Sequence, residues 1–168
     1  NGTTDALVYD FVIAQAENSW LSGPTATGWI YGGDKIAAKA SAKFGTVTVE
    51  YKLSTAADTE YSETLPSAAG TYTARFTVTE TTDYEGLSET ANFTISKAQV
   101  TIPSEDETTY TYNGQNQTYV IANSNLYTVS NNTRINAGSQ KVVVSLKDSN
   151  NYEWADGSID NLEFDFII

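Results

Sequence analysis

Strict alternation of apolar and polar residues along much of the chain is the feature that most limits its possible folds. In residues 71–78, for example, Tyr72, Ala74, Phe76 and Val78 fall on one face. A period of two places successive side chains on opposite sides of an extended strand, whereas a helix would scatter them. The same alternation recurs in four other stretches, residues 45–53, 91–95, 141–146 and 162–168. We therefore predict an all-β protein whose strands each have one buried face.

Two parts of the chain carry the same pattern of residues. Gly70 precedes Asp83-Tyr84 by the same distance at which Gly138 precedes Asn151-Tyr152. Further matches pair Tyr31-Gly32-Gly33 with Tyr112-Asn113-Gly114, and Phe93-Thr94-Ile95 with Phe166-Ile167-Ile168. Such internal similarity indicates tandem copies of one unit. We interpret residues 14–97 and 98–168 as two β-sandwich domains. The junction, Ser96-Lys97-Ala98, contains no Gly or Pro, so we expect a short and stiff linker.

A third copy is visible in part at the start of the chain. Residues 1–13 align without a gap on residues 156–168, with identical residues that include Leu7, Phe11 and Ile13. We interpret residues 1–13 as the terminal hairpin strand of a preceding repeat. An apolar strand without a partner tends to add to a free sheet edge. We therefore expect this strand to pack on the edge of domain 14–97 or on a neighbouring molecule.

The composition excludes several classes of function. The chain has 168 residues and neither His nor Cys, so it cannot build a Ser–His–Asp or Cys–His catalytic device or a Cys-ligated zinc site. Its formal net charge is −12, which disfavours binding to nucleic acid and to anionic membranes. No apolar run reaches the length of a membrane helix. We predict a protein that is not an enzyme, needs no cofactor and does not insert into a membrane.

Aromatic residues near predicted loops are the candidate ligand-binding residues. Trp154 lies between Tyr152 and the Asp156-Gly157 turn, so we expect it to be partly exposed, and Trp20 lies near the start of domain 14–97. Such rings could stack on the apolar face of a sugar, or they could pack in the core or at domain junctions. Trp29 belongs to the repeated pattern, and we assign it to the core.

Acidic residues near the last turns are the candidate ligands for a metal ion. Asp148, Asp156 and Asp160 could offer oxygen atoms to Ca²⁺, which prefers six to eight of them. Their spacing matches no EF-hand loop. The alternative is that these residues form turns and keep the protein soluble.

Several of the repeated stretches resemble a known class of bacterial repeats. Trp29-Ile30-Tyr31-Gly32, Ala69-Gly70-Thr71-Tyr72-Thr73 and Asn151-Tyr152-Glu153-Trp154 are similar to the tandem Ig-like, MBG-type extracellular repeats of Firmicutes cell-surface, adhesin-like proteins. The resemblance implies two tandem immunoglobulin-like modules in a secreted protein of the bacterial cell wall. It implies a spacer or stalk whose partners are neighbouring repeats. The alternative is an adhesive module that recognises a host glycan or surface protein through loop aromatics.

Overall fold

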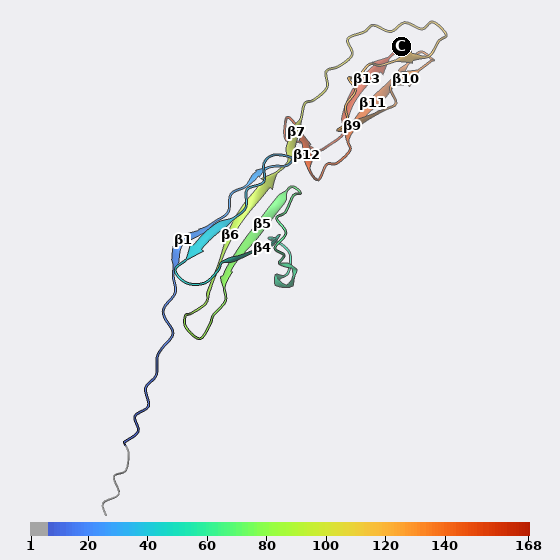
Figure 1. Ribbon diagram of the computed structural model, residues 1–168. Helices are drawn as coiled ribbons and strands as arrows, with labels where there is room; N and C mark the ends of the chain where they lie inside the picture. Colours follow the sequence, from blue (N-terminus) through green and yellow to red (C-terminus); the bar gives the residue numbers. More distant parts are fainter. Residues whose placement is uncertain (1–6) are drawn as a thin grey trace, which may run out of the picture. The chain divides into compact units, whose positions relative to one another are not determined.

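The structure, a computed structural model, describes residues 7–168 (Figure 1). Within these residues the only helical element is the short 3-10 helix η1 (Asp58–Glu60). The prediction of an all-β chain is confirmed. In chain order the strands are β1 (Trp20–Thr25), β2 (Trp29–Ile30), β3 (Lys39–Ala42), β4 (Thr48–Leu53), β5 (Gly70–Val78), β6 (Leu87–Ser96), β7 (Ala98–Val100), β8 (Gln117–Thr118), β9 (Tyr127–Ser130), β10 (Thr133–Arg134), β11 (Ser139–Leu146), β12 (Tyr152–Trp154) and β13 (Leu162–Ile167).

The strands form several small sheets. Four strands pair in the order β2-β6-β5-β4, three pair in the order β13-β11-β9, and the remaining pairs are β1-β3, β12-β7 and β10-β8. The chain separates into two compact units that do not follow the sequence repeats. The first unit combines the chain up to Thr27 with Ala37–Leu65 and Tyr72–Phe93, and the second combines Gly28–Ile36, Pro66–Thr71 and Thr94–Ile168. The domain bounds 14–97 and 98–168 describe sequence duplication and stay a prediction.

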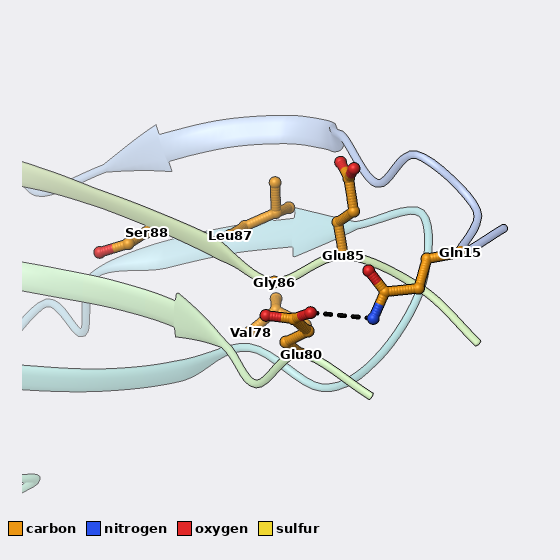
Figure 2. Close-up of a pocket in the computed structure, with 7 residues that line it drawn as sticks. All are labelled: Gln15, Val78, Glu80, Glu85, Gly86, Leu87 and Ser88. Carbon is orange, nitrogen blue, oxygen red and sulfur yellow. Dashed lines mark hydrogen bonds between the residues drawn. The ribbon is translucent and has the colours of Figure 1, made fainter. Parts of the chain in front are cut away.

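Residues 7–13 lie outside every strand, contrary to one of our expectations. Their large apolar side chains are between 81% and 92% exposed, and the first bridge of the described chain joins Ala16 to Tyr84. Next to that bridge, Gln15 Nε2 donates to Glu80 Oε1 at 2.8 Å, beside a shallow depression in the surface (Figure 2). The predicted pairing of residues 7–13 with an edge of domain 14–97 is therefore wrong, because no part of residues 7–168 pairs with them.

In the first unit, β5 buries the alternating apolar residues that the sequence predicts to lie on one face. Tyr72, Ala74, Phe76 and Val78 are buried, and the residues between them are half-buried on the opposite face. β5 pairs with β4 in antiparallel register, with Val49 opposite Phe76. Burial of the apolar face stabilises the folded sheet, and the polar face stays in contact with water. The strand predicted over residues 71–78 is confirmed.

Aromatic rings fill the remaining core of the first unit. The ring of Phe93 on β6 stacks on Tyr72 at a centroid distance of 5.6 Å and meets Tyr51 edge to face at 6.0 Å. The Tyr51 hydroxyl accepts a hydrogen bond from the backbone N–H of Ala38 at 3.1 Å. A buried tyrosine is stable here because its hydroxyl has a partner.

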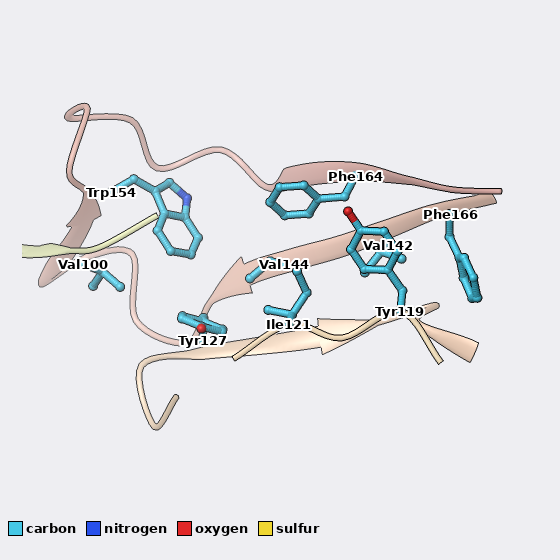
Figure 3. Packing of buried hydrophobic residues seen from close by; sticks show 9 residues of the cluster. All are labelled: Val100, Tyr119, Ile121, Tyr127, Val142, Val144, Trp154, Phe164 and Phe166. Carbon is cyan, nitrogen blue, oxygen red and sulfur yellow. The ribbon is translucent and has the colours of Figure 1, made fainter. Parts of the chain in front are cut away.

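The second unit has a continuous apolar core between β11 and the segments that cover it (Figure 3). β11 lies between β13 and β9, and its residues Val142 and Val144 are completely buried. Trp154 on β12 is also completely buried, and its indole Nε1–H donates to the backbone oxygen of Asp160 at 2.8 Å. The buried core residues of this cluster are Val100, Tyr119, Ile121, Tyr127, Val142, Val144, Trp154, Phe164 and Phe166.

Candidate functional site

The linker between β6 and β7 is the centre of the candidate functional site. β6 ends at Ser96 and β7 begins at Ala98, so Lys97 is the only residue between the two strands. The Lys97 ammonium donates to the backbone oxygen of Ser149 at 2.7 Å, and the Ala98 N–H donates to the backbone oxygen of Asn151 at 3.0 Å. These bonds hold the linker against the loop that precedes β12. We call Lys97, Asn151, Ala69, Tyr31 and Tyr152 the Lys97 junction; all five belong to the second unit.

The Asn151 side chain joins two loops within this junction. Its Oδ1 accepts the backbone N–H of Ala69 at 2.8 Å, and its Nδ2 donates to Asp148 Oδ2 at 2.8 Å. The Asp148 carboxylate also accepts the backbone N–H groups of Asn150 and Asn151. The side-chain hydrogen bond from Asn151 is the main cause that lowers the pKa of Asp148. Because both ends of the Asn151 amide are bonded, its orientation is fixed.

Two tyrosines complete the junction. The rings of Tyr31 and Tyr152 meet edge to face at a centroid distance of 5.3 Å, and both are half-buried. The Tyr31 N–H donates to the backbone oxygen of Ser96 at 2.8 Å, immediately before the linker. Just upstream, a Cβ on Gly28 would lie 2.0 Å from the backbone oxygen of Thr94, so only glycine allows this close approach. The junction thus combines backbone pairing with packing of side chains.

The predicted aromatic binding residues do not form an exposed platform. The expectation that Trp154 is partly exposed is wrong, because the side chain is completely buried and its N–H is bonded to Asp160. Tyr152 pairs with Ala98 in parallel register and packs on Tyr31. Trp20 is half-buried on β1 in the first unit.

The predicted acidic metal ligands serve separate turns. Asp148 bonds to Asn151, as described above, whereas Asp156 Oδ1 accepts the Ser158 N–H at 2.9 Å. Hydrogen bonds from Ser158, the backbone one first, lower the pKa of Asp156. Asp160 is exposed and contributes its backbone oxygen to Trp154. Within residues 7–168, no three acidic side chains are grouped closely enough to hold a metal ion.

Asp106 forms a second polar cluster, which sequence reasoning missed. Its carboxylate accepts the backbone N–H groups of Thr108 at 3.0 Å and Val120 at 2.6 Å, together with the Tyr110 hydroxyl. Hydrogen bonds from the Thr108 and Tyr110 side chains are the main causes that lower the pKa of Asp106. Burial, followed by the hydrogen bond to Asp106, raises the pKa of Tyr110 to about 12. This carboxylate therefore fastens the loop after β7 to the segment that follows β8.

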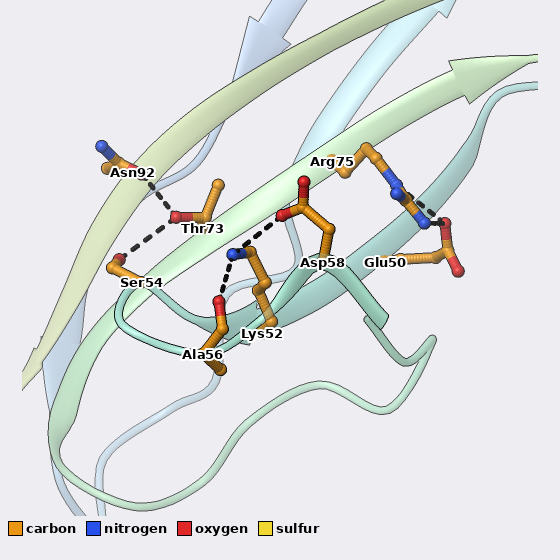
Figure 4. Close-up of polar contacts among 8 residues, drawn as sticks. All are labelled: Glu50, Lys52, Ser54, Ala56, Asp58, Thr73, Arg75 and Asn92. Carbon is orange, nitrogen blue, oxygen red and sulfur yellow. Dashed lines mark hydrogen bonds and ion pairs between the residues drawn. The ribbon is translucent and has the colours of Figure 1, made fainter. Parts of the chain in front are cut away.

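A third polar cluster lies on the outer face of β4 and β5 (Figure 4). Lys52 forms an ion pair with Asp58 at 3.0 Å, and Arg75 forms one with Glu50 at 2.8 Å. The two cations also face the ring of Tyr61, with the Arg75 guanidinium carbon 3.9 Å and the Lys52 nitrogen 5.3 Å from its centroid. Tyr61 follows η1, so these contacts hold the long β4–β5 loop on the sheet.

These three clusters have a common chemistry. They consist of hydrogen bonds, ion pairs and ring contacts that fix loops, and the sequence offers neither His nor Cys to them. Comparisons with models of protein families, with curated proteins and with solved structures find no match for this chain. Among residues 7–168 there is also no helix whose length and hydropathy would let it cross a membrane.

Proposed function

We propose that the chain is a pair of tandem immunoglobulin-like modules that act as a spacer or stalk in an extracellular, adhesin-like protein of the bacterial cell surface. The single observation that carries the proposal is the length of the linker. One residue, Lys97, separates β6 from β7. The resemblance of the repeated stretches to bacterial surface repeats supports the location, and the all-β architecture is compatible with a β-sandwich for each module.

A one-residue linker suits a spacer for a simple physical reason. Each residue outside regular structure adds two soft backbone torsions, so a longer linker allows more orientations. At Lys97 the side chain is also bonded, to the Ser149 backbone oxygen. The Asn151–Ala69 bond and the Tyr31–Tyr152 contact add further restraints. These contacts lie within the second unit and fix the conformation of the linker itself, which is the local property that a stiff spacer requires.

Distance measurements between spin labels would test the proposal. Because the chain contains no Cys, single cysteines at Glu89 on β6 and Glu163 on β13 would carry the labels at unique, exposed positions. We expect one narrow distance distribution. Insertion of four glycines after Lys97 should broaden it several-fold, because the inserted residues add freely rotating bonds.

The matched control inserts the same four glycines after Asn113, within the turn at Asn113-Gly114. That insertion lengthens the chain between the labels without altering the linker, so the narrow distribution should persist. A broad distribution in the unaltered protein, or equal broadening by both insertions, would contradict the spacer proposal.

The alternative proposal, an adhesive module for a host glycan or protein, has weaker support. It depends on exposed loop aromatics, whereas Trp154 is buried and Tyr152 packs against Tyr31. Trp20 is half-buried. Binding to a glycan array that is abolished by Trp20→Ala, in a variant that keeps its thermal stability, would favour this alternative over the spacer.

A further inference from the structure

We propose that residues 7–13 form the last strand of another module of the same class, placed before residue 14 in the same polypeptide, and that they bind its open sheet edge. The inference rests on the proposed function, since it assumes an array of modules. The starting observation is the exposure of this segment. Leu7, Tyr9, Phe11 and Ile13 alternate along it, and each is more than four-fifths exposed. An extended apolar segment in this state is a strand that lacks its sheet.

The contacts just after the segment identify what should cover it. Ala16 pairs in parallel with Tyr84, and its N–H donates to the Asp83 backbone oxygen at 2.8 Å. Ala98 pairs in parallel with Tyr152, and its N–H donates to the Asn151 backbone oxygen at 3.0 Å. The two alanines therefore hold the same place in their two repeats.

The residues immediately before these alanines also correspond. Gln15 Nε2 donates to the backbone oxygen of Thr81 at 2.6 Å, and Lys97 Nζ donates to that of Ser149 at 2.7 Å. Figure 2 shows the Gln15 side chain directed back toward Glu80, beside this contact. Gln15 is thus the counterpart of the linker residue Lys97.

This correspondence extends upstream into the exposed segment. Ile95 and Phe93 lie two and four positions before Lys97, and both are buried on β6, at 1% and 6% exposure. Counting back from Gln15 by the same steps reaches Ile13 and Phe11, which are exposed. The same two residue types therefore precede both linkers. Phe93 and Ile95 lie near the end of β6, a strand that is covered by its own sheet. Phe11 and Ile13 are exposed, so they require the equivalent sheet of another module.

The last strand of the chain gives the expected register. Phe11 matches Phe166 and Tyr9 matches Phe164 in the alignment of residues 1–13 with residues 156–168. On β13, Phe166 lies opposite Gln140 and Phe164 lies opposite Val142 of β11. The partner should therefore present a strand like β11, antiparallel to residues 7–13.

The same alignment adds an electrostatic preference. Asp10 matches Asp165, which forms an ion pair with Lys141 of β11 at 2.9 Å. The partner strand should therefore offer a basic residue opposite Asp10. An exposed pair of this kind contributes little energy, but it favours the correct register.

A longer chain tests the inference. It carries an added body, which is a second copy of the first predicted module without the last part of its final strand. Residues 14–88 are placed before residue 7 of the full chain, so that Leu7 follows Ser88 and residues 7–13 take the place of residues 89–95. We expect the added body to fold with this borrowed strand. Amide hydrogen exchange at Tyr9, Phe11 and Ile13 should slow by at least about 100-fold relative to the original chain.

Two controls make the result decisive. The double substitution Phe11→Asp and Ile13→Asp should unfold the added body, yet leave the stability of the original chain unchanged because both side chains are exposed there. A second chain keeps the native strand by placing residues 14–95 before residue 14. If this second chain folds and the first does not, residues 7–13 are not a competent last strand and the inference fails alone. If neither added body folds, the proposed array fails as well.

A second copy of the chain is the competing partner. In that case residues 7–13 of the original, unextended chain would gain exchange protection as its concentration rises, with matching dimer formation in sedimentation. This result would overturn the inference in favour of association between chains.

Discussion

Asn151 accepts a hydrogen bond from the backbone N–H of Ala69 at 2.8 Å, although the two residues lie 82 positions apart in the chain. Ala69 directly precedes β5, and Asn151 directly precedes β12. The bond therefore ties the start of one strand to the start of another, next to the linker at Lys97. Since the opposite end of the same amide is held by Asp148, Asn151 is the residue on which the geometry of the Lys97 junction most depends.

Replacing Asn151 with alanine should destabilise the second unit. Asn151→Ala removes the acceptor of the Ala69 N–H and the donor to Asp148, so we expect the free energy of unfolding to fall by about 1–2 kcal/mol. Urea denaturation followed by tyrosine and tryptophan fluorescence would measure it. The neighbouring substitution Asn150→Ala, at an exposed position, is the control and should cost less than about 0.5 kcal/mol. Equal effects would show that the amide bonds are dispensable.

Replacing Trp154 should affect folding rather than ligand binding. Trp154→Ala leaves a large cavity beside Tyr127, whose ring centroid lies 5.8 Å from that of Trp154, and we expect a loss of about 3–5 kcal/mol. Thermal and chemical unfolding would measure this loss. Tyr112→Ala is the matched aromatic control, because Tyr112 is 59% exposed and its removal leaves the core intact. A Trp154→Ala protein as stable as this control would contradict the buried assignment.

The stability of the second unit should depend on acid pH through Asp106. Hydrogen bonds, first from the Thr108 side chain and then from Tyr110, lower the pKa of Asp106 in the folded protein. A carboxylate with a depressed pKa adds stability at a pH above its unfolded value, and this stability is lost as the pH falls through the folded value. We therefore expect a decline that begins below about pH 4.

Asp106→Asn is the corresponding test. The variant should be less stable than the original protein at pH 7, and the difference between the two should shrink as the pH is lowered from 4 to 2. Glu105→Gln, at the exposed neighbouring position, should leave the pH profile unchanged. If Asp106→Asn follows the original profile at every pH, the hydrogen bonds to the carboxylate do not contribute as proposed.

The ring of Tyr61 should control access to the β4–β5 loop. Tyr61→Leu retains an apolar side chain but removes the attraction of the ring for Arg75 and Lys52, so the loop should open more often. We expect cleavage by a protease within this loop to accelerate roughly five-fold, since two such contacts contribute about 1 kcal/mol or more. Tyr61→Phe keeps the ring and should be cleaved at the original rate. Faster cleavage of the phenylalanine variant would instead point to the hydroxyl.

The sequence predicts strands well where one face packs on the same chain. β5 pairs with β4 and β6 on either side, and its four alternating apolar residues are all buried on one face. Residues 7–13 show an equally apolar pattern, yet they form no strand in residues 7–168. Alternation indicates the capacity to pair, whereas pairing itself depends on a partner that a local pattern cannot specify.

The candidate site was harder to predict because its key groups are few and distant in sequence. The spacing of Tyr152 and Trp154 places both on one face of a strand, and this signal could have indicated that Trp154 is buried. The sequence Asp106-Glu107-Thr108 favours a local turn through the aspartate side chain, which would have explained part of the Asp106 cluster. The contacts of Asp106 with Val120 and of Asn151 with Ala69 leave no local signal, since they follow from tertiary packing alone.

The linker also changes which side of the strand faces inward. Ile95 and Val100 are both buried, but they are separated by an odd number of positions, so a single uninterrupted strand would point them in opposite directions. Lys97 absorbs this phase difference. Inserting one residue beside Lys97 while the local conformation of Lys97 is kept should direct Gln99 toward the interior in place of Val100, whereas inserting two residues should preserve the orientation. The parity of this linker, together with its length, is therefore a property that natural variants should conserve.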